Sequence, residues 1–130
     1  RSPKVVHKRA GLYFYRLHEQ SITGSFSLRR TDVLDITDEI VAYMAKRHHR
    51  LLSASLDRKF AANMNILWLM TRSRQSDVAV EQRCWGNIKA LRFAVLSNPD
   101  SRLKNRIGAL VAFLGKRTLK YFFRLKRHKR

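Results

Sequence analysis

From Thr31 onward, apolar residues recur at intervals of three or four, the spacing that places side chains on one face of an α-helix. Residues that favour helix starts divide this region into four predicted helices. The first residues of these helices are expected at Thr31 or Asp32, Ser53 or Ser55, Ser76, and Asn98. In a chain of 130 residues, this pattern predicts one mainly α-helical domain.

We expect each helix to bury its apolar stripe against the other helices. Cys84 lies in the stripe of the third helix and is predicted to be a buried apolar residue rather than a nucleophile. The last helix is predicted to run from Asn98 to Leu125 without a break, with residues 103–114 in the core. The stripe of the first helix comprises Val33, Ile36, Ile40, Val41 and Met44. The stripe of the last helix comprises Leu103, Ile107, Leu110, Leu114, Tyr121 and Leu125.

The first thirty residues differ from the rest of the chain. β-branched and aromatic residues predict two short strands, near residues 4–8 and 11–17, and a loop follows from Ser21. Two strands alone are not stable in water, so we expect them to form the edge of a sheet whose remainder is absent. The chain begins at Arg1, and we expect it to be a segment of a longer protein.

Positive charge is strongly in excess and is concentrated near the C-terminus. The chain contains 28 Lys and Arg against 9 Asp and Glu, which gives a formal net charge of +19. After Asp100 there are eleven basic residues and no acidic one. This asymmetry indicates a polyanionic partner, which is a nucleic acid, an anionic lipid surface or a phosphorylated ligand. The alternative is a solvated basic surface that only keeps the protein soluble.

Other features narrow the possible functions. The longest apolar run, residues 109–114, is far shorter than the roughly 18 residues that a membrane-spanning helix needs. The single cysteine rules out an internal disulfide, and a reducing, cytoplasmic location is the default. His48 and His49 are adjacent, so a helix would point them about 100° apart, which makes them poor joint metal ligands. No glycine-rich phosphate loop or Cys-x-x-Cys motif is present.

One polar cluster near the N-terminus stands out. If the second strand runs into a loop, Arg16, His18, Ser21 and Thr23 can converge on an anion such as a diphosphate. Arginine supplies paired donors, histidine supplies a donor or a metal ligand, and the hydroxyls supply further donors. The alternative is an ordinary strand end with polar side chains facing solvent.

The same segment, Tyr-Phe-Tyr-Arg-Leu-His-Glu-Gln-Ser-Ile-Thr at residues 13–23, resembles the closing stretch of the catalytic domain in bacterial family-2 glycosyltransferases. These are GT-A-fold enzymes of surface-polysaccharide assembly. The resemblance extends over residues 4–70 and includes Arg-Lys-Phe-Ala-Ala-Asn at residues 58–63. It implies transfer of a sugar from a nucleotide-diphospho-sugar to a lipid-linked or saccharide acceptor. It also implies that Arg16 and His18 lie beside the donor diphosphate and its divalent Mg or Mn ion, with His18 as a metal ligand. Ser21 and Thr23 would lie on a loop that closes the site.

The resemblance also implies that the Asp-x-Asp metal motif and the catalytic base would precede residue 1. We therefore expect no catalytic residue, no cofactor and no sugar transfer in this chain alone. Residues 1–28 would be the last strands and loop of a GT-A-type catalytic domain. Residues 29–115 would be a helical C-terminal region, and residues 116–130 a basic amphipathic tail. Nucleotide sugar and acceptor would be bound through the missing domain.

The basic tail is predicted to bind an anionic membrane, because basic residues flank the apolar stripe of its helix and aromatic residues lie near the charge. This binding would place the protein in the cytoplasm, on the inner face of the membrane. The predicted membrane-contact residues are Lys116, Arg117, Lys120, Tyr121, Phe122, Phe123, Arg124 and Arg127.

Two other interpretations remain open. The first is a small basic helical module that binds nucleic acid, for which the net charge and the aromatic residues among basic ones argue. The second is a helical module that binds a partner and completes an oligomer, including a homo-oligomer.

Overall fold

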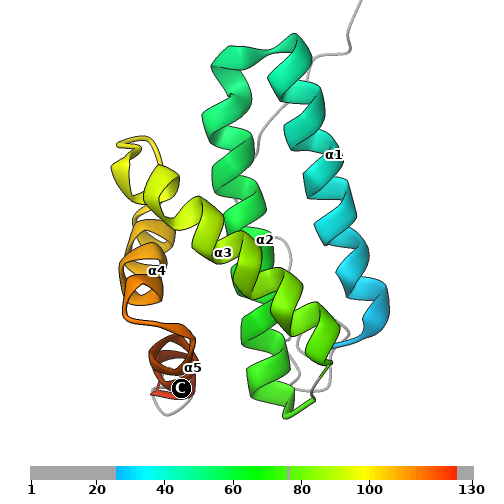
Figure 1. The fold of residues 1–130 in the computed structure, drawn as a ribbon, viewed down its shortest axis with the longest axis vertical. Helices are drawn as coiled ribbons and strands as arrows, with labels where there is room; N and C mark the ends of the chain where they lie inside the picture. The colour runs from blue at the N-terminus through cyan, green and yellow to red at the C-terminus, as the bar shows by residue number, and fades with distance from the viewer. Residues whose placement is uncertain (1–25, 76, 126–130) are drawn as a thin grey trace, which may run out of the picture.

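The computed structural model describes residues 26–75 and 77–125, and all of the regular secondary structure in these ranges is helical (Figure 1). The prediction of a mainly α-helical fold is therefore confirmed. The predicted strand pair lies outside the described residues. The elements are, in order, η1 (Leu28–Thr31), α1 (Asp32–Arg47), η2 (His49–Leu51), α2 (Leu52–Ser73), α3 (Val78–Ser97), α4 (Leu103–Phe113) and α5 (Lys116–Leu125).

Helix α2 is the centre of the arrangement and contacts each of the other four α-helices. Figure 1 shows α1 and α2 as a helical hairpin, with α3 crossing over α2 and α4 and α5 on the side away from α1. Phe60, Leu67 and Leu69 of α2 are almost completely buried, as are Ile88 and Val95 of α3. Since α2 is buried on several sides, it carries the largest share of the core.

Two buried groups of the core, the Asn63 amide and the Cys84 thiol, have a clear structural explanation. The Asn63 side chain accepts a hydrogen bond from Asn87 Nδ2 at 3.0 Å and donates one to the Lys59 carbonyl oxygen at 2.8 Å. Cys84 is fully buried, as predicted, and burial raises the pKa of its thiol to about 11. The thiol is therefore protonated at neutral pH and does not act as a nucleophile.

The predicted stripe of the first helix is only partly buried. Leu34 and Thr37 are the fully buried residues of α1, whereas Ile36 and Ile40 are exposed. Ion pairs hold this helix to its neighbours, because Asp38 pairs with Lys59 of α2 at 2.8 Å. Arg83 of α3 bonds to Asp35 at 2.6 Å and to Asp38 at 2.9 Å.

The predicted helix start at Asn98 is wrong. The Asn98 side-chain oxygen accepts a hydrogen bond from the backbone N–H of Asp100 at 3.0 Å, so this segment forms a turn between α3 and α4. Helix α4 begins at Leu103 instead. Asn and Pro favour tight turns as well as helix starts, and here the chain uses them to reverse direction.

The prediction of one unbroken last helix is also wrong. Gly115 has a φ of +108°, a conformation that side chains other than glycine rarely adopt, and it separates α4 from α5. The described part of the chain therefore contains five α-helices, where the spacing predicted four.

Candidate functional site

Helix α4 buries a face made of small residues. Asn105, Gly108, Ala109 and Ala112 are buried and lie on the side that faces α2 and α3. A Cβ atom at Gly108 would lie 2.7 Å from the Cε atom at the tip of the Met64 side chain on α2. The Met64 side chain therefore occupies the space beside Gly108, and a larger residue at this position requires that side chain to shift.

The large apolar residues of α4 lie on the opposite face and are exposed. We call Leu103, Ile107, Leu110 and Leu114 the α4 stripe. They follow one another at spacings of four, three and four residues, so they share one side of the helix. The prediction that residues 103–114 bury this stripe in the core is wrong. The exposed fractions, in the same order, are 72%, 44%, 58% and 72%.

Basic residues border the α4 stripe. On a helical projection, Lys104 lies to one side of the stripe and Arg106 to the other, and Lys104 is exposed. Phe113 widens the apolar surface and is 43% exposed, with the Arg92 guanidinium 4.4 Å from its ring centroid. Because no acidic residue follows Asp100 in the sequence, the border of the stripe on α4 itself carries positive charge only.

Helix α5 has the reverse arrangement. Leu119 is fully buried and Phe123 is 9% exposed, and both belong to the same core as α2 and α3. The predicted membrane-contact residue Phe123 is therefore placed in the core, because its ring fills space between packed helices. Apolar packing of α5 thus stabilises the fold.

Two lysines of α5 that belong to the predicted membrane-contact set form ion pairs with Glu81 of α3. Lys120 Nζ lies 2.7 Å from Glu81 Oε2, and Lys116 Nζ lies 3.0 Å from Oε1. The hydrogen bond from Lys120, with that from Lys116, holds the pKa of Glu81 below its usual range despite partial burial. These two ammonium groups are only partly available to an external anion.

The remaining predicted contact residues are distributed as follows. Arg117, Tyr121 and Arg124 are exposed on α5, and Phe122 is half-buried. Arg127 lies outside the described residues. The exposed surface of α5 therefore supplies two guanidinium groups and one aromatic ring from the original set.

The N-terminal candidates lie outside the described residues, so the structure does not place Arg16, His18, Ser21 or Thr23. Within residues 26–75 and 77–125, no group of three or more His, Cys, Asp or Glu side chains is arranged to hold a metal ion. Among the helices described, none is both long enough and apolar enough to cross a bilayer.

The α4 stripe is the feature that sequence reasoning assigned to the wrong environment. A signal was present, since Gly108, Ala109 and Ala112 form a second face of small residues opposite the large ones. Small residues on one side of a helix indicate close helix packing there. That observation predicts that the large residues point outward.

Comparisons of the chain with protein-family models, with curated proteins and with solved structures found no match.

Proposed function

We propose that this chain is the acceptor-side, membrane-docking part of a family-2 glycosyltransferase, and that the α4 stripe enters the interface of an anionic membrane. The observation that carries the membrane proposal is the exposure of four large apolar side chains in one row, bordered by Lys104 and Arg106. The glycosyltransferase part rests on the resemblance of residues 4–70 to the end of that catalytic domain.

Hydrophobic transfer favours the insertion of the stripe. Full burial of a Leu or Ile side chain is worth about 1.5–3 kcal/mol, and the four residues are between 44% and 72% exposed. Lipid insertion of this row would therefore contribute several kcal/mol. The arrangement of small residues toward protein and large apolar residues outward is also typical of helices that face lipid.

The basic residues beside the α4 stripe and on α5 favour a membrane with an anionic surface. Each Lys or Arg near an anionic surface contributes on the order of 1 kcal/mol. Lys104 and Arg106 border the stripe, and Arg117 and Arg124 are exposed on the following helix. An 11-residue helix is about 16 Å long, so α4 suits a position parallel to the membrane plane.

Docking of this kind would hold a catalytic domain at the cytoplasmic membrane surface, where a lipid-linked acceptor presents its head group. The nucleotide sugar and the Mg or Mn ion would bind in the domain that carries the Asp-x-Asp motif and the catalytic base. Detectable sugar transfer from a nucleotide sugar by the 130-residue chain alone would contradict this division of roles.

The membrane proposal is tested by co-sedimentation of the 130-residue chain with vesicles of phosphatidylcholine, with and without phosphatidylglycerol. We expect binding that requires the anionic lipid. The double variant Leu110→Ser with Leu114→Ser should bind at least about tenfold more weakly, which corresponds to about 1.4 kcal/mol. The matched control is Leu28→Ser with Leu51→Ser, since these leucines are 63% and 51% exposed on other elements.

The alternative functions predict different results. A nucleic-acid-binding module would bind RNA or DNA with a steep dependence on salt and would be indifferent to the serine substitutions. A partner-binding module would change its oligomeric state when the stripe is altered and would not sediment with vesicles. Equal loss of vesicle binding in the control variant would show that the α4 stripe is not the docking surface.

A further inference from the structure

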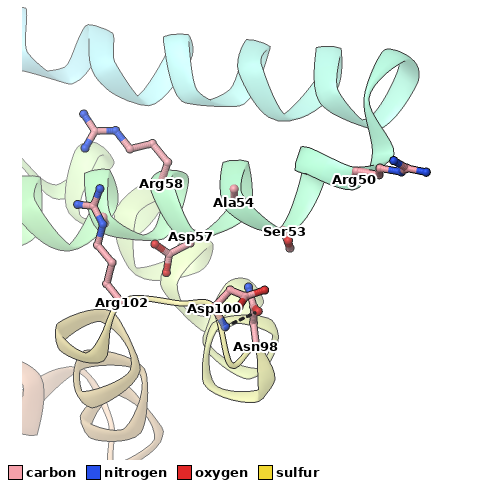
Figure 2. Close-up of a pocket in the computed structure, with 9 residues that line it drawn as sticks. Arg50, Ser53, Ala54, Asp57, Arg58, Asn98, Asp100 and Arg102 are labelled. Carbon is pink, nitrogen blue, oxygen red and sulfur yellow. Dashed lines mark hydrogen bonds between the residues drawn. The ribbon is translucent and has the colours of Figure 1, made fainter.

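A polar cavity of about 330 Å³ lies between the first half of α2 and the turn that joins α3 to α4 (Figure 2). Its volume is at the lower end of the range for small-molecule sites, which is about 300–1,000 Å³. The turn at residues 98–102 supplies one wall and residues 50–61 supply the other. The charged and amide side chains that line it are Arg50, Asp57, Arg58, Asn98, Asp100 and Arg102.

Two of the arginines offer donor groups that have no acidic partner among the residues that the structure describes. Arg58 comes from α2 and Arg102 is the residue that precedes α4, so two separate elements contribute an exposed arginine to the lining of one cavity. Neither side chain forms an ion pair with another described residue. Figure 2 shows Arg50 at the far edge of the cavity, apart from the other two. Paired guanidinium groups are suited to the oxygens of a phosphate.

The arginines need a hydrogen-bond acceptor from a ligand, whereas Asp57 needs a donor. Its Oδ2 atom accepts a hydrogen bond from Asn105 Nδ2 at 3.0 Å. Its Oδ1 atom is buried, and no other described residue donates a hydrogen bond to it. A buried acceptor without a donor is destabilising, because it loses its hydrogen bonds to water and gains none in return. A ligand that fits this cavity therefore brings a donor, such as a hydroxyl group, to Asp57.

A simple anion satisfies the arginines but is repelled by the carboxylates of Asp57 and Asp100. A neutral polyol satisfies Asp57 but leaves the guanidinium groups without an acidic partner. We infer that this cavity binds a phosphate ester that carries free hydroxyl groups, with the phosphate on Arg58 and Arg102 and a hydroxyl on Asp57. Such an ester is either a soluble molecule or the glycerol-phosphate head group of an anionic lipid. The inference does not depend on the membrane proposal, because a soluble ester binds whether or not α4 meets lipid.

The first measurement titrates glycerol 3-phosphate and, separately, inorganic phosphate into the ¹⁵N-labelled 130-residue chain at constant ionic strength. We expect saturable amide shifts confined to residues 50–61 and 98–102, with tighter binding of glycerol 3-phosphate than of inorganic phosphate. Shifts spread over all basic surfaces, no saturation, or equal affinity for the two probes would overturn the inference.

Variants separate the roles of the side chains. Arg58→Ala with Arg102→Ala should weaken glycerol 3-phosphate binding at least about tenfold. The control, Arg29→Ala with Lys89→Ala, removes the same charge from exposed positions that do not line the cavity and should change the affinity less than about twofold. Equal effects of the two double variants would show that general electrostatic attraction, and not the cavity, accounts for binding of glycerol 3-phosphate.

Asp57→Asn tests the hydroxyl contact itself. The amide can still accept from Asn105, but it presents an N–H group where the unpaired oxygen was, and it removes a negative charge. We expect tighter binding of inorganic phosphate and loss of the preference for glycerol 3-phosphate. If the preference survives in this variant, Asp57 does not bind the hydroxyl and the proposed ligand class is wrong.

The source of the ester is identified with vesicles that contain phosphatidylglycerol. If the ligand is a lipid head group, Arg58→Ala with Arg102→Ala weakens vesicle binding more than the control variant does, and glycerol 3-phosphate competes. If the ligand is a soluble ester, the arginine double variant weakens glycerol 3-phosphate binding in the titration and does not weaken vesicle binding more than the control variant does. The Leu110→Ser with Leu114→Ser variant should retain glycerol 3-phosphate binding, so failure of the membrane proposal and failure of this inference are distinguishable.

Discussion

Helices α4 and α5 follow one another in the chain, and they orient their large apolar residues in opposite directions. Helix α4 buries Gly108, Ala109 and Ala112 and exposes its leucines. Helix α5 buries Leu119 and Phe123, and its exposed side carries Arg117 and Arg124 together with Tyr121 and Leu125. The comparison shows that an amphipathic pattern identifies a helix and its faces, but it does not show which face the rest of the protein covers.

The difference has a physical cause. The Met64 side chain of α2 fills the space beside Gly108, so the small face of α4 packs there without displacing a neighbour. Helix α5 reaches the core through large side chains, and Lys116 and Lys120 hold it to Glu81. Large apolar residues therefore stabilise the fold in α5, and in α4 they are available for an external surface.

The largest expected effect is on stability, when a large apolar side chain is removed from the buried face of α5 or from the exposed α4 stripe. Phe123→Ala should lower the free energy of unfolding by about 3 kcal/mol, because it opens a cavity in the core. Leu114→Ala should change it by less than about 0.5 kcal/mol, because that side chain is 72% exposed. Urea denaturation of both variants checks this difference, and equal losses would show that the comparison of the two helices is wrong.

A smaller effect is expected from filling the small face of α4. Gly108→Leu should lower the free energy of unfolding by about 2 kcal/mol, since the new side chain must displace Met64. Gly86→Leu is the control, because no heavy atom lies within 4 Å of a Cβ built at that position. The control should instead gain up to about 1 kcal/mol from helix propensity. Denaturation midpoints of the pair would refute the tight-packing argument if both variants were stabilised.

The smallest effect concerns the attachment of α5 to α3. Glu81→Gln should lower the free energy of unfolding by about 1 kcal/mol at pH 7, a modest value because the two lysines are partly exposed to solvent. The folded-state pKa of Glu81 lies below its ordinary value of 4.5. Its stabilisation is therefore complete above that value and is lost as the pH falls through the folded-state pKa.

Unfolding measurements from pH 7 to pH 3 check this prediction. The difference between the wild-type chain and Glu81→Gln should shrink as the solution becomes acidic. Glu39→Gln is the matched control, because Glu39 is exposed and forms no ion pair with another described residue. A difference that stays constant over the whole pH range would mean that the ionised carboxylate does not hold α5.

Local features of the sequence were sufficient for some of the fold. The second helix was predicted to begin at Ser53 or Ser55, and α2 begins at Leu52. The burial of Cys84 was also predicted, because its position in the apolar row of α3 is unambiguous. At Asn98 the same residue types suit a helix start and a turn, so local preference alone did not distinguish them.

The candidate surfaces were less predictable. Sequence reasoning assigned the membrane-contact role to residues 116–130 and the core role to residues 103–114, whereas the core in fact includes Leu119 and Phe123. The cavity between α2 and the α3–α4 turn gave no sequence signal, since Arg58 and Arg102 are far apart in the chain.

The sequence by itself determined that this chain is mainly helical, where its central helices lie and that its last third is basic, because periodicity and charge are local properties of the chain. Only the tertiary structure decided which face of α4 is covered and which side chains meet across the cavity. The reason is that burial depends on the space left by the neighbouring helices, and the small residues of α4 indicate close packing but not the position of the elements that form this space.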